Sequence, residues 1–181
     1  MNTRSIILSA ALLPALAYAQ DRYATRTGEV SFFSHTSMED IDAVTHKATS
    51  VFDASTGAVE FSILVKSFEF EKALMQEHFN ENYMESNTYP KATFKGKYEG
   101  FSAEQLKKPG TYPVTATGDL TIHGVTKPVT SKGTITVDDN GVLKASSDFL
   151  VKPADYGIKI PGGVNIAEDI EVKARIEYHK M

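Results

Sequence analysis

Five histidines are the side chains of this sequence best suited to metal binding or acid–base catalysis, at His35, His46, His78, His123 and His179. No two of them stand in an H-x-H or H-x-x-x-H pair, and the chain contains no cysteine. A zinc-type site would therefore have to assemble from distant segments. We expect no bound metal.

Two of these histidines have neighbours that suit acid–base chemistry. His78 lies beside Glu77 and near Glu81, although a helix residue with a satisfied ring nitrogen is the simpler interpretation. His123 alternates with Thr121 and could either line a cavity or end a strand. A barrel enzyme acting on an apolar substrate, with one of these imidazoles as its base, therefore stays open as an alternative.

Signals for a nucleophile or a phosphate-binding cofactor are missing from the sequence. It has no G-x-S-x-G turn and no glycine-rich phosphate loop. Adjacent acidic residues occur at 39–40, 138–139 and 168–169, where turns with solvated carboxylates are expected. We predict no catalytic residues and no cofactor, and therefore a protein that is not an enzyme.

Most of the sequence alternates apolar and polar residues with the period of half-buried strands. Eight such stretches are expected at 29–35, 38–51, 58–66, 91–98, 111–123, 127–137, 142–151 and 166–178. A turn is expected at Gly28, a tight hairpin at Asn140-Gly141, a polar linker at 100–110 and a loop at 153–165. Eight amphipathic strands either stack as two sheets or close into a barrel, and the pattern alone does not decide between them. The ten Phe and eight Tyr favour the enclosed arrangement.

One stretch, residues 68–90, changes to helical spacing. Its helix-face positions are i, i+1, i+4, i+5 and i+8, at Leu74, Met75, His78, Phe79 and Asn82. This predicts a short helix that ends at 80–82, and Pro90 returns the chain to a strand. A single helix rich in large apolar side chains in an all-β chain predicts a plug, a lid or a clamp.

The first nineteen residues resemble a secretory signal peptide rather than part of the fold. Arg4 precedes an apolar run at 6–16, and Ala17-Tyr18-Ala19 matches a small-x-small cleavage pattern. The run is too short for a transmembrane helix. We expect residues 1–19 to be removed and residues 20–181 to form one exported domain, periplasmic or extracellular. With a formal net charge of −4 and mixed charges, neither nucleic acid nor an anionic membrane is an expected partner.

Three segments together resemble the YceI family. They are ALMQEHFNENYMESNTYPKATFKG (Ala73 to Gly96), GDLTIHGVTKPV (Gly118 to Val129) and SDFLVKPADYGIKIPG (Ser147 to Gly162). The resemblance implies an eight-stranded, lipocalin-like antiparallel β-barrel with one short helix between strands. It also implies a periplasmic protein that holds a long apolar chain, such as a polyisoprenoid, an isoprenoid quinone or another lipid, in its lumen.

Apolar residues of the helical stretch and of the strand faces are the predicted wall of that lumen. They are Phe61, Ile63, Val65, Phe68, Leu74, Met75, Phe79, Tyr83, Met84, Phe94, Leu120, Ile122, Phe149, Tyr156 and Ile158. For any one of these residues, ordinary core packing is the simpler interpretation. A structural or stress-protective barrel without a ligand therefore stays open, as does a homodimer.

Overall fold

The computed structural model describes residues 21–36, 40–160 and 166–181. Its strands are β1 (Arg22–His35), β2 (Asp40–Asp53), β3 (Ala58–Leu64), β4 (Glu69–Phe70), β5 (Lys91–Glu99), β6 (Gly110–Ile122), β7 (Val125–Val137), β8 (Leu143–Val151) and β9 (Ile170–Lys180). Its helical elements are α1 (Ala73–His78), the π-helical turn η2 (Phe79–Tyr83), and the 3-10 turns η1 (Val65–Ser67), η3 (Gln105–Lys107) and η4 (Pro153–Tyr156). The predicted signal peptide and the expected structure at 37–39 and 161–165 lie outside the described residues.

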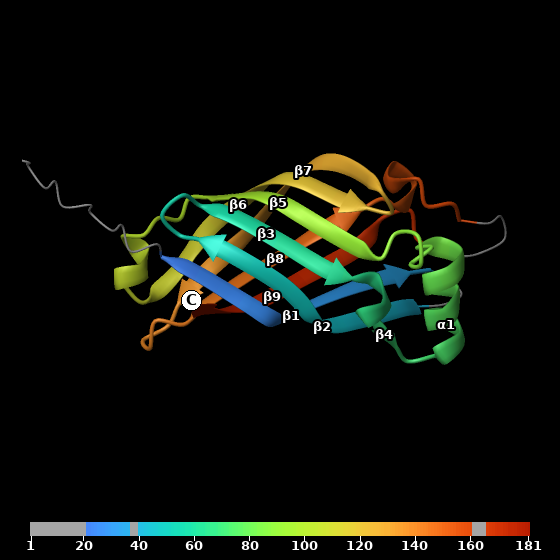
Figure 1. Cartoon of the computed structure of the whole chain (residues 1–181), viewed down its shortest axis with the longest axis horizontal. Helices are drawn as coiled ribbons and strands as arrows, with labels where there is room; N and C mark the ends of the chain where they lie inside the picture. Colours follow the sequence, from blue (N-terminus) through green and yellow to red (C-terminus); the bar gives the residue numbers. More distant parts are fainter. Residues whose placement is uncertain (1–20, 37–39, 161–165) are drawn as a thin grey trace, which may run out of the picture.

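Eight strands close into an antiparallel barrel, seen from the side in Figure 1. Neighbours pair in the order β1-β9-β8-β7-β6-β5-β3-β2, and pairing of β2 with β1 completes the ring. The two-residue β4 extends the β2 edge beyond the end of β3. The predicted all-β barrel with one short helix is confirmed, and the pairing of β1 with β2 resolves the choice between sandwich and barrel because it closes the sheet into a ring.

The first strand differs from its prediction at Gly28. The expected turn is wrong, because β1 continues through this residue with a register shift on either side of it. A Cβ at Gly28 would lie 2.6 Å from Ile176 Cδ1 and 3.1 Å from the Ala48 carbonyl oxygen. Glycine therefore lets the bulged part of the strand pack closely on the core, as bulges do where a barrel bends. The hairpin at Asn140-Gly141 forms as predicted, with Gly141 at φ +78°.

The end of the barrel opposite α1 is filled with side chains. Phe52, Leu143 and Tyr178 are almost completely buried there. The Phe52 ring packs against Tyr98 at 5.2 Å and Tyr178 at 5.9 Å between centroids. The segment between β5 and β6, expected to be a polar linker, instead places Phe101 in this core. We call this region the filled end.

A chain of buried hydroxyl groups lies within the filled end. Ser50 Oγ donates to the Glu60 carbonyl oxygen at 2.9 Å and lies 2.7 Å from the Tyr178 hydroxyl. The Tyr98 hydroxyl lies 3.5 Å from that of Tyr178. Burial raises the pKa of Tyr178 to about 12, since a phenolate there would be desolvated.

We expect stability to fall between pH 10 and pH 12 because of this phenol. A raised folded-state pKa contributes stability below the ordinary pKa of 10.0 and loses it as pH rises toward 12. The two-unit difference corresponds to about 2–3 kcal/mol in the free energy of unfolding. Urea unfolding at pH 9 and pH 12 measures the loss. Tyr178→Phe should lower the free energy of unfolding by about 1 kcal/mol at pH 9, but this variant should then lose less stability than the parent between pH 10 and pH 12. An equal loss of stability in the variant and the parent over this pH range would show that Tyr178 is not the group responsible.

Candidate ligand-binding cavity

The half of the barrel nearer α1 contains a cavity of about 960 Å³. Every strand of the ring contributes lining residues, among them Val30, Phe61, Leu120 and Val172, although β2 contributes only Ile41 near its start. Within the part of the chain that the structure describes, no Asp, Glu, Lys or Arg lines this cavity. An apolar enclosure of this size is typical of a small-molecule site rather than of a packing defect.

The cavity exists because small side chains meet at the middle of the barrel. On β6 to β9 the inward positions there are Ala116, Ser131, Gly133, Ala145, Ser147 and Ala174. Register places them side by side: Ala116 opposes Ser131, and Gly133 opposes Ser147, which opposes Ala174. The large residues of the filled end stop where this belt begins. The lumen is therefore half solid and half hollow.

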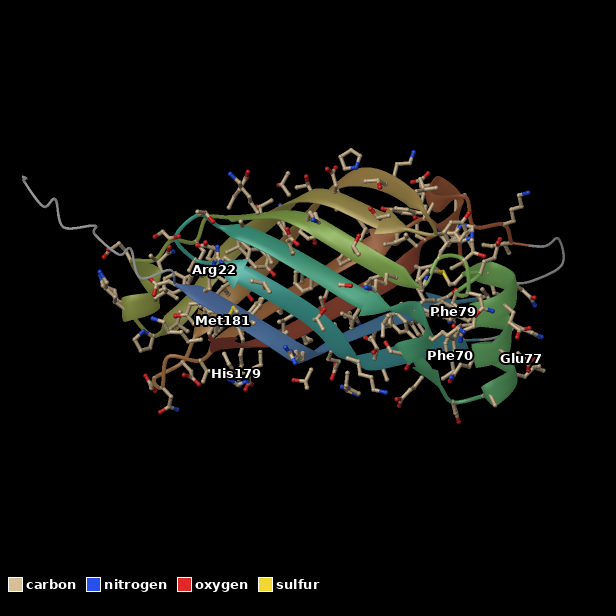
Figure 2. All side chains as sticks on the ribbon, viewed as in Figure 1. Arg22, Phe70, Glu77, Phe79, His179 and Met181 are labelled. Carbon is tan, nitrogen blue, oxygen red and sulfur yellow. The ribbon has the colours of Figure 1, made fainter. Side chains whose placement is uncertain are left out.

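The helical segment caps the hollow half, as Figure 1 shows at the end of the barrel that carries α1. Phe79 of η2 packs on Phe32, Phe68 and Phe70, with ring centroids 5.3, 5.8 and 5.0 Å away respectively. In Figure 2, Phe70 and Phe79 lie together on the barrel side of this segment, whereas Glu77 points away. This aromatic cluster fixes the rotation of the cap and turns Met75 toward the lumen.

Thirteen of the predicted lumen residues line the cavity. They are Phe61, Ile63, Val65, Phe68, Met75, Phe79, Tyr83, Met84, Phe94, Leu120, Ile122, Phe149 and Ile158. Whether they contact a ligand stays a prediction. The remaining two, Leu74 and Tyr156, do not line it.

Both departures have a physical cause. Leu74 precedes Met75 by one residue, or about 100° around a helix, so once Phe79 is docked on the aromatic cluster Leu74 faces solvent and is 62 % exposed. Tyr156 is buried, but against the β6–β7 turn, where its carbonyl oxygen lies 3.3 Å from His123 Nδ1.

Several lining residues escaped the sequence prediction. Val30 and Phe32 on β1 and Val172 on β9 occupy alternate inward positions of strands that the sequence did predict. The alternation of apolar and polar residues along these strands could have identified them as inward-facing. The small residues of the belt carried no such signal, because alanine, serine and glycine in a strand do not reveal which face they occupy.

The two histidines considered for catalysis lie apart. His78 lines the cavity at its α1 end and is exposed. His123 sits outside the cavity in the β6–β7 turn, where its ring packs on Tyr89 at 4.4 Å and its Nε2 lies 3.4 Å from Glu85 Oε1. Among the described residues, neither imidazole meets a carboxylate inside the lumen, and no group of three potential metal ligands is found.

The arrangement suits enclosure of an uncharged, elongated molecule. Its wall offers dispersion contacts and removal of apolar surface from water, with few polar groups to fix a ligand's orientation. No helix within the described ranges has the length and hydrophobicity needed to cross a bilayer.

Comparison with known sequences identifies relatives along most of the chain. The family model of the YceI-like domain matches residues 22–178. A UPF0312 protein of Pseudomonas syringae pv. tomato is 26 % identical over 189 residues, covering 93 % of this chain and 92 % of the relative. A UPF0312 protein of Pseudomonas putida (strain W619) is 32 % identical over 96 residues. That match covers 50 % of this chain and somewhat less than half of the relative, 46 %.

Solved structures share the fold at low sequence identity. A polyisoprenoid-binding domain from Saccharophagus degradans, described as implicated in plant cell wall breakdown, superposes with a TM-score of 0.76 at 14 % identity. That superposition covers 90 % of this chain and 99 % of the other. Burkholderia cenocepacia BcnA superposes with a TM-score of 0.68 at 20 % identity, covering 84 % and 96 % of the two chains.

Proposed function

This chain belongs to the YceI-like domain family, and on that premise we propose that it is an exported carrier of a long isoprenoid or similar lipid. The observation that carries the proposal is the cavity of about 960 Å³, whose described lining residues include no charged side chain. The polyisoprenoid-binding domain with the same fold supports this choice of ligand class. The signal-peptide pattern of residues 1–19 supports export.

The size of the cavity sets the length of the ligand. At about 30 Å³ for each water-sized group, 960 Å³ has room for about 30 non-hydrogen atoms, or about six isoprene units. Each unit of five carbons contributes about 3–4 kcal/mol on burial. Association costs about 4–15 kcal/mol, so micromolar affinity requires about four to six enclosed units. The cavity can therefore enclose about as many isoprene units as micromolar binding requires.

Native mass spectrometry tests the proposal directly. Protein produced with its own leader and purified from an exporting bacterium should carry a copurified lipid, and delipidated protein should bind an isoprenoid of about six units. Binding at 100 times Kd should stabilise the fold by about 2.7 kcal/mol, seen as a higher Tm.

A matched pair of variants gives the control. Val172→Trp places a large ring in the lumen and should prevent loading, whereas Lys173→Trp adds the same ring to the outer face of β9 and should not. Protein that is always recovered empty, and that no isoprenoid stabilises, would refute the carrier function.

A further inference from the structure

The wall of the barrel divides between β7 and β8. These strands pair at only five positions, from Val137–Leu143 to Gly133–Ser147. Residues 125–132 of β7 continue as a strand paired with β6, and residues 148–151 of β8 continue paired with β9. In this region β7 remains paired with β6 and β8 remains paired with β9, but β7 and β8 are not paired with each other. We call the unpaired region the split.

The cavity extends into the split. On most strands the lining residues alternate, as Val30, Phe32 and Ser34 do on β1, because every second side chain faces inward. Along the split they are consecutive: Val129, Thr130 and Ser131 on β7 and Phe149, Leu150 and Val151 on β8. Among the other described strand residues, Thr93 of β5 also breaks the alternation, as do Thr134 and Ser146 where β7 and β8 are still paired beside the split. Consecutive lining residues on two facing strands that are not paired with each other indicate that the cavity reaches between β7 and β8 here.

A pair of hydroxyl groups marks the inner end of the split. Ser131 Oγ and Ser147 Oγ lie 2.5 Å apart. The Lys132 carbonyl oxygen lies 2.9 Å from Ser147 Oγ and 3.4 Å from Ser131 Oγ. Either serine can donate its hydroxyl proton to the other. In both arrangements one proton lies between the serines and the second is donated to the Lys132 carbonyl oxygen. Both protons are used within the wall, so the pair offers only lone pairs to a ligand.

The polar character continues to the outer surface. Thr134 Oγ1 and Ser146 Oγ lie 2.9 Å apart one position further along the same strands. Beside them Arg175 forms an ion pair with Asp148 and donates to the Ser147 carbonyl oxygen at 3.2 Å. Leu150 lies at the outer edge and is 63 % exposed. A route from the apolar lumen to solvent therefore passes hydroxyl groups first and charges afterwards.

We propose that the split holds the polar end of the bound isoprenoid, and that this end is a hydrogen-bond donor such as a hydroxyl or an amide N–H. The inference rests on the proposed carrier function and adds the chemistry and direction of its ligand. The chain fills the lumen, its end group donates to the Ser131–Ser147 pair, and substituents beyond that group reach solvent between β7 and β8. An isoprenoid whose end only accepts hydrogen bonds finds no donor in this pair.

Site-directed labelling locates the end group. The chain has no cysteine, so a single thiol can be placed at either of two leucines of equal exposure: Leu150→Cys beside the split or Leu74→Cys on the cap, 63 % and 62 % exposed in the parent. The probe is geranylgeranylamine bromoacetamide, which carries an N–H donor. The introduced thiolate attacks its CH₂ carbon, a C–S bond forms and bromide leaves. We expect labelling of the Leu150→Cys variant at least tenfold faster, because binding raises the local concentration of the probe there.

Every outcome is informative when bound probe is measured in parallel by native mass spectrometry. Equal labelling of both variants, or faster labelling at Leu74→Cys, would show that the end leaves under the cap and would overturn the inference. A bound probe that labels neither thiol would place its end group deep in the lumen and would also overturn it. A probe that does not bind at all would instead refute the carrier function.

The donor requirement has its own test. Geranylgeraniol should bind about two- to tenfold more tightly than its methyl ether, the effect of one neutral hydrogen bond. Ser131→Ala/Ser147→Ala should abolish this preference while it keeps the ether's affinity. Thr111→Val/Thr136→Val removes a comparable hydroxyl pair on the outer face of β6 and β7, 3.0 Å apart, and should preserve the preference. A preference that survives in the serine variant would refute the role of the pair.

Discussion

Replacement of Met75 and Phe79 by glutamate should abolish retention of the isoprenoid. Both side chains line the cavity at its capped end. Burial of a Met or Phe side chain contributes about 1.5–3 kcal/mol each, so loss of both contacts predicts a 10²- to 10⁴-fold weaker complex. Two carboxylates in an uncharged lumen add a further desolvation penalty for the bound state. Native mass spectrometry and isothermal titration of delipidated protein measure the loss.

A second double variant separates loss of the cap from added charge. Leu74→Glu/Asn82→Glu introduces the same two charges on exposed positions of the same segment and should bind like the parent. The barrel ladder does not include α1 or η2, so Met75→Glu/Phe79→Glu should keep a strand-type circular dichroism spectrum. Unchanged retention in that folded variant would place the helical segment outside the site.

The cap shows what local periodicity can predict and where it fails. Helical spacing identified Met75 and Phe79, because one helix face recurs every three to four residues whatever the surroundings. It also selected Leu74, since a segment this short presents two adjacent faces with similar hydrophobicity. The choice between those faces depends on Phe32, which comes from β1 and contacts Phe79 only in the folded barrel. Rotation of the helix is therefore a tertiary property.

The hollow of the barrel was even less accessible from sequence. Alternation predicted the strands and most of the inward apolar side chains, but the cavity depends on Gly133, Ser147 and Ala174 being neighbours across three strands. Register between strands is set by turns and bulges far from these residues. The split leaves no local trace either, because β7 and β8 each remain paired on their other side.

Removal of a phenyl ring should have very different costs at the two ends of the lumen. Phe52 is fully buried in the filled end, so Phe52→Ala should lower the free energy of unfolding by about 3–5 kcal/mol. Phe61 lines the cavity and is only partly buried, with Phe94 as its aromatic neighbour at 6.2 Å. A ring that faces empty space makes fewer van der Waals contacts, so Phe61→Ala should lower the free energy of unfolding by only about 1–2 kcal/mol in delipidated protein.

Urea unfolding with matched m-values measures both costs, and the ligand supplies the decisive control. With a saturating isoprenoid present, the cost of Phe61→Ala should rise because the ring then contacts the bound chain, whereas the cost of Phe52→Ala should stay the same. Equal costs for the two variants in delipidated protein would mean that the lumen is filled in solution. The chain would then be a structural barrel without a ligand, since a solid core leaves no room for an isoprenoid.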